Sequence, residues 1–406
     1  MKKFNKNIIV FVLVSLFIVL GYSINSIKSL MHCSYQFLVI NLKSEGLSAF
    51  ETFASDIDGY STDLLQYHNR LMDLDSLKHL LINTRLIEKE DTSVVKANNN
   101  TLTESCARCP DEVIEHSASV IHSLQMTAEE NNADFLYVAV PGKNAIYTTP
   151  ENIENYALDN YTRYLQALRQ KDIPVLDLYD ELRQNNMLTA NTYFITDHHW
   201  TPETGFWATG RICDTLNQQY GFEYNNDYTN IDNYDLKTYP NQFLGSYGKK
   251  TGRFFTAGGP DDFTLITPKF ETKFTVLQPL KEEEQTGNFE EAVLDTSMLQ
   301  IQNHYASWTY LTYSGDFRLQ IIKNHLNPEG KKILVVRDSC AGVVTPFLAL
   351  NAGELHIVDV RDFISSDPID VYGYLRDISP DYVLVLYSGT ETPEQTSGKF
   401  NFSLPE

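Results

Sequence analysis

The sequence is poor in basic residues. Its 406 residues include 32 Lys and Arg against 53 Asp and Glu, which gives a net charge of -21 at pH 7. Proteins that bind nucleic acid need a basic face, so this balance argues against that class, and it also disfavours tight adsorption to anionic lipid. A hydrophobic fraction of 42% excludes a wholly disordered chain. The length allows one large domain with additions, or two domains.

Cysteine is scarce, and the five cysteines are an odd number. Cys106 and Cys109 form a C-x-x-C motif, but a second such motif, which would complete a zinc site, is missing. The residues before it, 98–101, are typical of a loop and not of the strand that a redox motif would follow. In an exported protein we therefore expect a small disulfide between these two cysteines. The remaining cysteines are expected to be unpaired: Cys33, Cys213 and Cys340.

The N-terminal segment has no alanine before Ala49 and hence no A-x-A cleavage site. Lys2, Lys3 and Lys6 precede an apolar run over residues 8–20. Basic residues at this place predict that the N-terminus stays in the cytoplasm. We expect an uncleaved signal anchor, which gives a single-pass membrane protein whose remaining chain lies outside the cytoplasm. A cleaved signal, and so a secreted protein, is the alternative.

Strand-like and helix-like segments alternate from Pro110 onward. Buried strands are predicted at residues 135–140, 173–178, 332–336, 355–360 and 382–386. Helices are predicted to begin at Pro110, to carry residues 161–168, and to span 201–220, 341–350 and 370–377. This alternation predicts a three-layer α/β/α fold with a mainly parallel sheet, in which functional sites lie at the carboxyl ends of strands.

The chain divides by pattern into three parts. Residues 1–30 are the expected cytoplasmic tip and signal anchor, and residues 31–109 an N-terminal extension or stalk. Residues 110–400 are the expected α/β domain, without a visible internal repeat. Within it, residues 222–325 interrupt the alternation with short strands at 263–267 and 273–276, which predicts an antiparallel insertion.

An Asp and two His lie where a strand-like stretch gives way to a helix. In an extended chain residues i and i+2 point to the same side, so Asp197 is expected to hold one imidazole nitrogen of His199. That pair is the Asp-His half of a nucleophilic triad. Two other interpretations stay open, a helix-entry hydrogen-bond network and a metal site that includes His198. The H-E-x-x-H spacing is missing, and we expect neither a metal nor a cofactor.

The nucleophile is expected to be Ser339, which follows the apolar strand at 332–336. At a strand-to-helix turn its hydroxyl would face His199 as general base, with Asp197 orienting the imidazole. Cys340 and Gly342 follow at the start of the next helix, where backbone N–H groups can receive a developing oxyanion. The G-x-S-x-G elbow of ordinary hydrolases is absent, and a helix-capping serine is the competing interpretation.

Lys143 follows the strand at 135–140 directly, at the edge of the sheet where a site is expected. It is interpreted as a substrate anchor or as an ion-pair partner of Asp338. The competing interpretation is a solvated loop lysine.

The segment Thr196-Asp197-His198-His199-Trp200-Thr201 resembles the signature of the bacterial DHHW family, which is similar to the SGNH hydrolase-like proteins of alginate O-acetylation, AlgJ and AlgX. The resemblance covers most of the exported chain. Its further landmarks are Val140-Pro141-Gly142-Lys143, Phe243-Leu244-Gly245-Ser246 and the segment from Lys332 to Ser339. In the alginate proteins an Asp-x-His-Trp motif and a Gly-Asp-Ser block supply the triad, which the resemblance carries over to Asp197, His199 and Ser339.

Two residues depart from the family pattern. Arg337 replaces the usual glycine before Asp-Ser, and Cys340 stands where phenylalanine is common. A thiol nucleophile at Cys340 is disfavoured because an adjacent residue in a tight turn points elsewhere. His198 is expected to play no direct part, since neighbouring side chains face opposite ways in an extended chain.

The resemblance implies an exported, membrane-anchored O-acyltransferase, specifically an O-acetyltransferase, that modifies a cell-surface or secreted polysaccharide through an acyl-serine. It also implies a membrane-bound O-acyltransferase partner that delivers the acyl group. Two alternatives stay open. One is a carbohydrate acetylesterase with the same triad, and the other is a catalytically inert glycan-binding surface protein.

Overall fold

The computed structural model describes residues 68–88, 93–313, 315, 317–361, 369–388, 400 and 402. The chain divides after Lys78 into two compact units, and residues 68–78 of the first are helical. The expected signal anchor lies outside the described residues. Within the described part, no helix combines the length and the apolar character that a membrane crossing requires. The second unit, from His79 onward, holds the sheet and the site.

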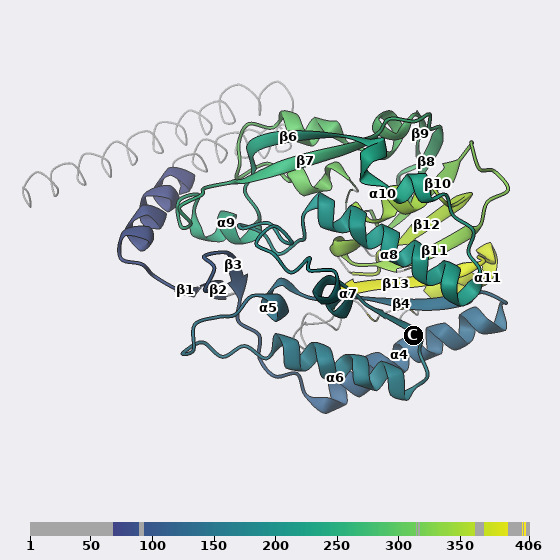
Figure 1. Cartoon of the computed structure of the whole chain (residues 1–406), viewed down its shortest axis with the longest axis horizontal. Coiled ribbons are helices and arrows are strands. Elements are labelled where there is room, and N and C mark those ends of the chain that lie inside the picture. Colours follow the sequence, from purple (N-terminus) through teal and green to yellow (C-terminus); the bar gives the residue numbers. More distant parts are fainter. Residues whose placement is uncertain are drawn as a thin grey trace, which may run out of the picture. The chain divides into compact units, whose positions relative to one another are not determined.

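A central sheet of eight strands runs through this second unit in the order β5-β4-β13-β11-β12-β10-β8-β9 (Figure 1). The first five strands are parallel to one another, and β10, β8 and β9 continue the sheet in antiparallel fashion. Along the chain they are β4 Asp134–Val140, β5 Val175–Asp177, β8 Phe274–Gln278, β9 Glu283–Gly287, β10 Leu319–Asn324, β11 Lys332–Arg337, β12 Glu354–Val358 and β13 Tyr382–Ser388. The sheet is therefore mixed, and its parallel part consists of the five strands predicted from the alternating pattern.

Helices cover both faces of this sheet. One face packs against α4 (Asp111–Glu130), α6 (Ala157–Gln170) and α11 (Val371–Ile378), and the other against α8 (Pro202–Tyr220) and α10 (Thr345–Ala349). Successive side chains of a strand point to opposite faces. In β11, accordingly, Ile333 and Val335 join the core beneath α8, while Leu334 and Val336 join the core beneath α4. The predicted three-layer α/β/α arrangement is confirmed.

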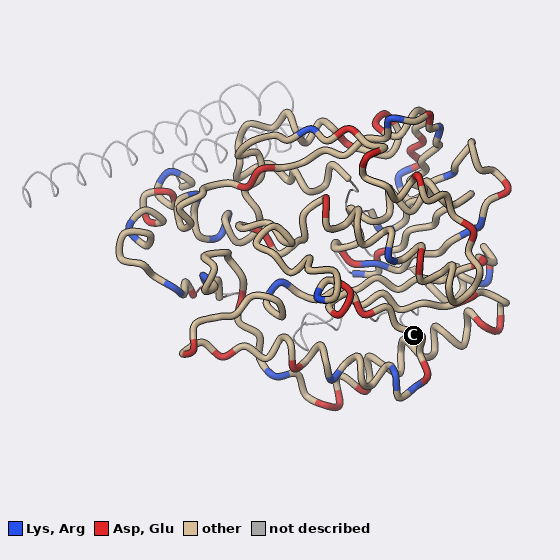
Figure 2. The backbone as a smooth tube through the Cα atoms, in the orientation of Figure 1, with Lys and Arg blue, Asp and Glu red and all other residues tan. Residues whose placement is uncertain are grey.

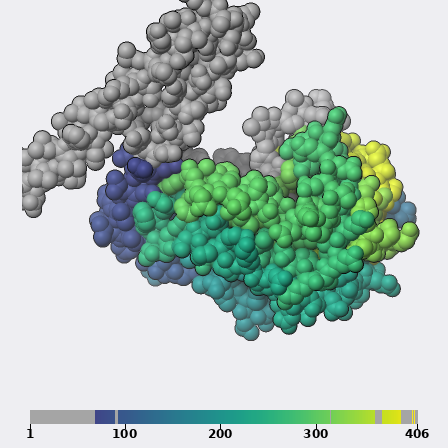
Figure 3. Space-filling view, turned by 90° about the horizontal axis from the view of Figure 1, so that it is seen from above, coloured from purple at the N-terminus to yellow at the C-terminus, as the bar shows by residue number. Residues whose placement is uncertain are grey.

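The segment that interrupts the alternation contributes antiparallel strands in two places. Strands β6 (Tyr234–Phe243) and β7 (Asp261–Pro268) pair in a two-stranded ribbon, whereas β8, β9 and β10 extend the central sheet. This segment makes much of the face seen in Figure 3. The edge strand β9 is exposed and begins with two glutamates, whose charges disfavour pairing with another sheet edge.

A small three-stranded sheet precedes α4. It consists of β1 (Leu86–Glu88), β2 (Ser93–Lys96) and β3 (Leu102–Glu104). Its Val94 and Leu102 share a hydrophobic cluster with Tyr247 of α9 (Ser246–Thr251) and with Phe255. The remaining helical elements are α5 Lys143–Ile146, α7 Leu178–Gln184, η3 Asn226–Thr229, η4 Ile231–Asn233, η5 Pro279–Lys281, η6 Phe289–Val293, η7 Thr296–Gln300, η8 Thr309–Thr312 and η9 Ser339–Val343.

Helix α8 begins and ends as the sequence predicts. Thr201 is the N-cap, and its side chain accepts a hydrogen bond from the backbone N–H of Thr204. Pro202 occupies the first helical position, where a missing N–H costs nothing. Gly221 ends the helix in the left-handed conformation at φ 72°, which glycine adopts without strain. These caps fix the point at which the Asp-His segment enters the helix.

The expected disulfide between Cys106 and Cys109 is wrong, because no bond joins these two buried cysteines. The side chain of Asn160 holds the segment instead. Its Oδ1 accepts the backbone N–H of Cys109 at 2.8 Å, and its Nδ2 lies 3.4 Å from Cys106 Sγ. Hydrogen bonds from Asn160 of α6 therefore hold this segment, where the C-x-x-C spacing had suggested a disulfide.

Charged residues of both signs are spread along the part of the chain that the structure describes. In Figure 2, Asp and Glu alternate with Lys and Arg along the backbone, and no continuous basic stripe runs across the part of the chain that the structure describes.

Helix α8 crosses η9 at close range, and a glycine makes this possible. A Cβ atom added to Gly205 would lie 2.8 Å from Val343 Cβ and still closer to its Cγ2. Val343 belongs to η9, which begins at Ser339. The approach of the two elements therefore determines how closely the Ser339 turn sits against α8.

We expect Gly205→Ala to destabilise the protein by about 1–3 kcal/mol, because the added methyl group has no room against Val343. Gly210→Ala in the same helix is the matched control, since its Cβ would meet only Thr229 Cβ at an ordinary 3.6 Å. That control should stabilise by up to about 1 kcal/mol through helix propensity. Urea unfolding of both variants measures the difference, and destabilisation of equal size at the two positions would contradict the proposed contact.

Candidate active site

The candidate site lies at the carboxyl ends of β4, β13 and β11, which are neighbours in the sheet. Directly after β11, Asp338 is buried and caps η9. Its carboxylate accepts the Cys340 N–H at 2.9 Å and, from the end of β13, the N–H and Oγ of Ser388 at 2.7 and 2.8 Å. These hydrogen bonds fix the turn that carries Ser339.

Ser339 is distinguished from its neighbours by exposure. From residue 333 to residue 353 every residue is buried except Ser339, which is partly exposed. The interpretation of Ser339 as the residue that caps the helix is not supported, because the N-cap is Asp338. The turn thus presents the hydroxyl of Ser339 at the edge of an otherwise buried segment.

Asp197 and His199 form the expected pair. Asp197 Oδ1 lies 2.5 Å from Nδ1 of His199 and also accepts the backbone N–H of His199 at 2.9 Å. The local geometry differs from the extended chain that the spacing suggested. Residues 195–199 form a bent loop, closed by a bridge between Tyr193 and Trp200. The bend, and not alternation along a strand, brings the imidazole back onto the carboxylate.

The second oxygen of Asp197 is bound by a distant segment. The backbone N–H of Ser246 donates to Asp197 Oδ2 at 2.6 Å. The preceding residue, Gly245, lies so close that an added Cβ would be 2.6 Å from Asp197 Cα. Only glycine at this position allows the backbone to approach the carboxylate. This requirement explains why the Phe-Leu-Gly-Ser landmark contains a glycine.

The charge state of Asp197 follows from these contacts. Burial acts to raise the pKa of its carboxyl group, but the neighbouring imidazoles of His198 and His199 and the hydrogen bond from Ser246 outweigh burial. They hold this pKa well below its ordinary value. Asp197 is therefore ionised at neutral pH and favours a proton on Nδ1 of His199, which leaves Nε2 as the proton acceptor.

Asp261 of β7 also supports the loop. Its carboxylate accepts the backbone N–H groups of Ile195 and Thr196 at 2.5 and 2.8 Å, and the hydroxyl of Thr196 at 2.5 Å. The β6–β7 ribbon therefore fixes the loop that carries the Asp-His pair.

Lys143 supports the same loop through the carbonyl groups of the loop. Its ammonium group donates to the carbonyls of Phe194, Ile195 and Asp197 at 2.5, 3.0 and 2.8 Å. The side chain is buried, and burial lowers its pKa to about 7 against the opposing charges of Asp261 and Asp197. The prediction of a substrate anchor or an Asp338 partner is thus corrected, because the short strand-to-helix turn after β4 directs Lys143 inward onto three carbonyls.

A hydrogen bond connects the two halves of the site. Trp200, the residue after His199, is fully buried, and its indole N–H donates to the carbonyl of Cys340, the residue after Ser339, at 2.9 Å. The fold therefore brings Asp197, His199 and Ser339 to one edge of the sheet although they are widely separated in sequence.

His199 and Ser339 are not hydrogen-bonded to each other in the structure. Nε2 of His199 is buried and has no partner among the described residues. The ring of Tyr310 stacks on His199 with centroids 3.9 Å apart. The imidazole is thus fixed at one nitrogen and by one ring face, while its second nitrogen stays available for a proton.

The structure does not support the expected role of Cys340 as an oxyanion donor in the turn after β11. The N–H of Cys340 donates to Asp338, so it is not available as the oxyanion donor that the sequence suggested. Its thiol is buried, and Gly342 is buried in η9. Arg337, which replaces the family glycine, is buried and donates through Nη2 to the carbonyl of Gly315 at 2.7 Å.

His198, which was expected to play no direct part, contacts residues of the site. In the bent loop its ring lies 3.8 Å from the His199 ring, and its Nδ1 is 2.9 Å from Ser246 Oγ. Burial and the neighbouring His199 lower the pKa of His198. Ligand atoms of Asp197, His198 and His199 lie within 4.8 Å of one another, so the three residues are close enough to hold a metal. One of the two imidazoles, however, has its Nδ1 committed to Asp197.

Several contributing residues were missed at the level of sequence. Asp261, Ser246 and Tyr310 act through contacts with residues about 50 or more positions away along the chain. No local pattern marks Asp261 or Tyr310, and the landmark that contains Gly245 and Ser246 did not indicate their roles.

We expect Lys143→Met to lower the free energy of unfolding by at least about 2 kcal/mol, because several buried carbonyls lose their donor. Lys332→Met is the matched control: Lys332 is partly exposed and donates to one carbonyl, that of Ile378, and its loss should cost under about 1 kcal/mol. Denaturant unfolding measures both. Unchanged stability together with weaker substrate binding in Lys143→Met would instead restore the substrate-anchor role.

Comparison with known proteins agrees with this architecture. Residues 102–233, which include the Asp-His pair but not Ser339, match the family described as the SGNH hydrolase-like domain of the acetyltransferase AlgX. No curated protein matches the chain. Among solved structures, PatB1 of Bacillus cereus is 22% identical with a TM-score of 0.60 and covers 78% of this chain and 99% of its own.

A DHHW family protein from Eubacterium siraeum is 19% identical with a TM-score of 0.56, and covers 79% of this chain and 98% of its own. At these identities the two structures establish a shared fold. The predicted SGNH hydrolase-like fold is therefore confirmed, and with it the resemblance to the DHHW family and to the alginate O-acetylation proteins.

Proposed function

We propose that this protein is an exported, membrane-anchored O-acetyltransferase that modifies a cell-surface or secreted polysaccharide. The observation that carries the proposal is the buried Asp197–His199 pair with a free Nε2, joined through Trp200 to the turn of the partly exposed Ser339. The match of residues 102–233 to the SGNH hydrolase-like domain of an acetyltransferase supports the reaction class.

In the proposed cycle, Ser339 Oγ attacks the carbonyl carbon of an acyl donor while His199 Nε2 takes its proton. Asp197 stabilises the resulting imidazolium, and His199 returns the proton to the leaving group. A sugar hydroxyl then attacks the acyl-serine, gives its proton to His199, and releases Ser339 with that proton. Because the Cys340 N–H is committed to Asp338, the proposed oxyanion donor is the backbone N–H of Ser339 itself.

An exposed aromatic ring beside the site is suited to a sugar acceptor. Trp308 is 53% exposed and stands two residues before Tyr310, which stacks on His199. Lys249 covers one face of the indole at 3.3 Å from a ring centroid. The open face of Trp308 would pack against the apolar face of a pyranose. The resemblance further suggests a membrane-bound O-acyltransferase that supplies the acyl group.

We expect a fluorophosphonate probe to label Ser339 in the full-length protein, with loss of fluoride and formation of a phosphonyl-serine. Ser339→Ala and His199→Ala should abolish the adduct, since one removes the nucleophile and the other its base. Ser246→Ala is the matched control, because Ser246 is also a partly exposed serine bonded to a histidine. Mass spectrometry of peptides locates the adduct.

An adduct that persists in Ser339→Ala and vanishes in Ser246→Ala would assign the nucleophile to Ser246. A folded protein that carries no adduct would support the inert glycan-binding alternative. Incubation with p-nitrophenyl acetate and neutral oligosaccharides then distinguishes a transferase from an esterase. Acetylated sugar indicates the transferase, whereas free acetate alone indicates the esterase.

We expect Gly245→Ala to slow this labelling by roughly a hundredfold, because the added methyl group displaces the carboxylate that orients His199. Gly258→Ala is the matched control, since nothing lies within 4 Å of its added Cβ. The pseudo-first-order labelling rate is the measurement, with circular dichroism to verify folding. A wild-type rate in Gly245→Ala would show that the approach of this backbone to Asp197 is not needed.

A further inference from the structure

A second pocket lies at the opposite edge of the sheet from Ser339. Its cavity of about 390 Å³ is lined by residues near the amino ends of the parallel strands, including Asn351 just before β12 and Phe274 at the start of β8. Ser339 instead follows the carboxyl end of β11. The six residues of β11 at about 3.3 Å each separate the two edges by roughly 20 Å.

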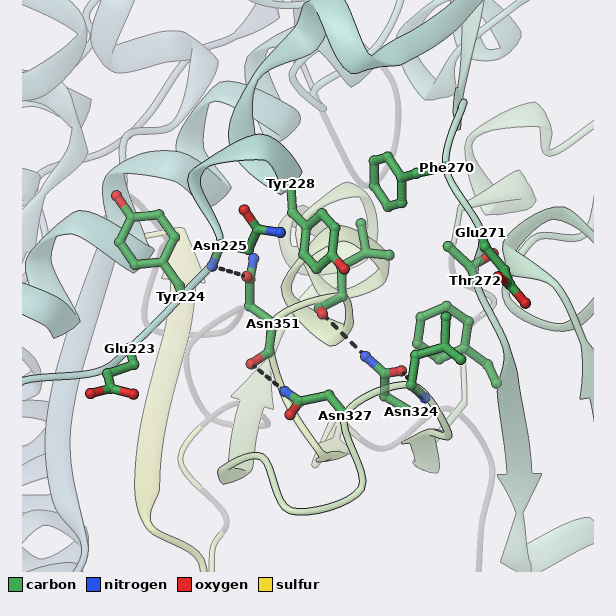
Figure 4. A pocket seen from close by; sticks show the side chains of 13 residues that line it. Glu223, Tyr224, Asn225, Tyr228, Phe270, Glu271, Thr272, Asn324, Asn327 and Asn351 are labelled. Atoms are coloured by element: carbon green, nitrogen blue, oxygen red, sulfur yellow. Dashed lines mark hydrogen bonds between the residues drawn. The ribbon is translucent and has the colours of Figure 1, made fainter.

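Aromatic rings and amide side chains share this pocket. Tyr228 and Phe270 stack with centroids 4.6 Å apart and stand on one side of it, as Figure 4 shows. The amide side chains of Asn324, Asn327 and Asn351 meet across from them. Several of these amides are held in place. Asn324 Nδ2 donates to the carbonyl of Leu350 at 3.1 Å, and Asn327 Nδ2 to the carbonyl of Asn351 at 3.4 Å.

Asn351 carries an unused donor at the pocket wall. Its Oδ1 accepts the backbone N–H of Asn225 at 2.9 Å, and because a backbone N–H can only donate, this contact fixes which end of the amide is oxygen. The other end, Nδ2, is buried and has no partner among the described residues, although Asn351 is only 4% exposed. Buried amide donors are normally satisfied, and because Asn351 lines the pocket, an acceptor held there is the candidate partner of this donor.

The charge of the lining restricts what that acceptor can be. Glu223 and Glu271 line it and are exposed, and none of the described residues that line it is Lys or Arg. Both carboxylates would repel an anion such as a uronate or a phosphate. Amide groups both donate and accept hydrogen bonds, as sugar hydroxyls require, and aromatic rings offer apolar faces.

We propose that this pocket binds a neutral sugar unit. The orphan donor of Asn351 bonds a hydroxyl or ring oxygen of that sugar, and Tyr228 packs against its apolar face. The inference concerns binding alone. If the proposed transferase function holds, the pocket retains a polysaccharide at a distance from the edge where acetyl transfer occurs.

The test is isothermal titration of the full-length protein at pH 8 with cellobiose and N,N′-diacetylchitobiose, to millimolar concentrations, and with digalacturonate as the anionic comparison. We expect at least one neutral disaccharide to bind and digalacturonate not to bind. Asn351→Asp keeps the oxygen that Asn225 requires and removes the donor, and Tyr228→Leu removes the ring. Each should weaken binding at least about tenfold.

Two controls accompany these variants. Tyr239→Leu changes a partly buried tyrosine outside the pocket and should bind as the wild type does. Ser339→Ala should also bind normally, so that retained binding without serine labelling separates this inference from the proposed function. Absence of neutral disaccharide binding, or binding that Asn351→Asp and Tyr228→Leu leave unchanged while thermal unfolding verifies that they are folded, would overturn the inference.

Discussion

The arrangement of the site depends on one buried carboxylate, that of Asp197. A buried charge is tolerated only when it is fully hydrogen-bonded, and Asp197 meets this requirement with both oxygens. His199 binds Oδ1 through its backbone and its ring, and Ser246 binds Oδ2. The Ser246 amide reaches the carboxylate only because Gly245 lacks a side chain. The α9 segment is therefore positioned by the same charge that orients the imidazole.

In this site, the groups that hold the loop in place are different from the groups that could take part in proton transfer. Lys143 and Asp261 both bind the backbone of the loop, so neither needs to contact a substrate. Trp200 connects that loop to the Ser339 turn. Among the described residues, Nε2 of His199 is left without a partner, and Ser339 stands partly exposed in its turn. A triad transfers a proton between these two groups.

Local chemistry explains which features the sequence could predict. The caps of α8 depend on Thr201, Pro202 and Gly221 alone, and they were predicted to the residue. The Asp197–His199 contact was also predicted, but its geometry was not, because the bend of the loop results from Lys143 and Asp261, which lie about 50 and 65 residues away. The expected disulfide failed for a related reason. A C-x-x-C spacing permits a bond, yet Asn160 from a distant helix occupies the space and satisfies the same segment.

The turn at Ser339 shows how tertiary contacts can specify a nucleophile without the G-x-S-x-G pattern. Asp338 accepts the N–H of Cys340, and Trp200 donates to its carbonyl, so both backbone groups of that residue are fixed. With Cys340 held on both sides, its thiol stays buried and the side chain before it must point outward. Gly205 then allows α8 to close over η9. The exposure of Ser339 within a buried segment is thus a consequence of how its neighbours are bonded, and a serine in this position does not require glycines on either side.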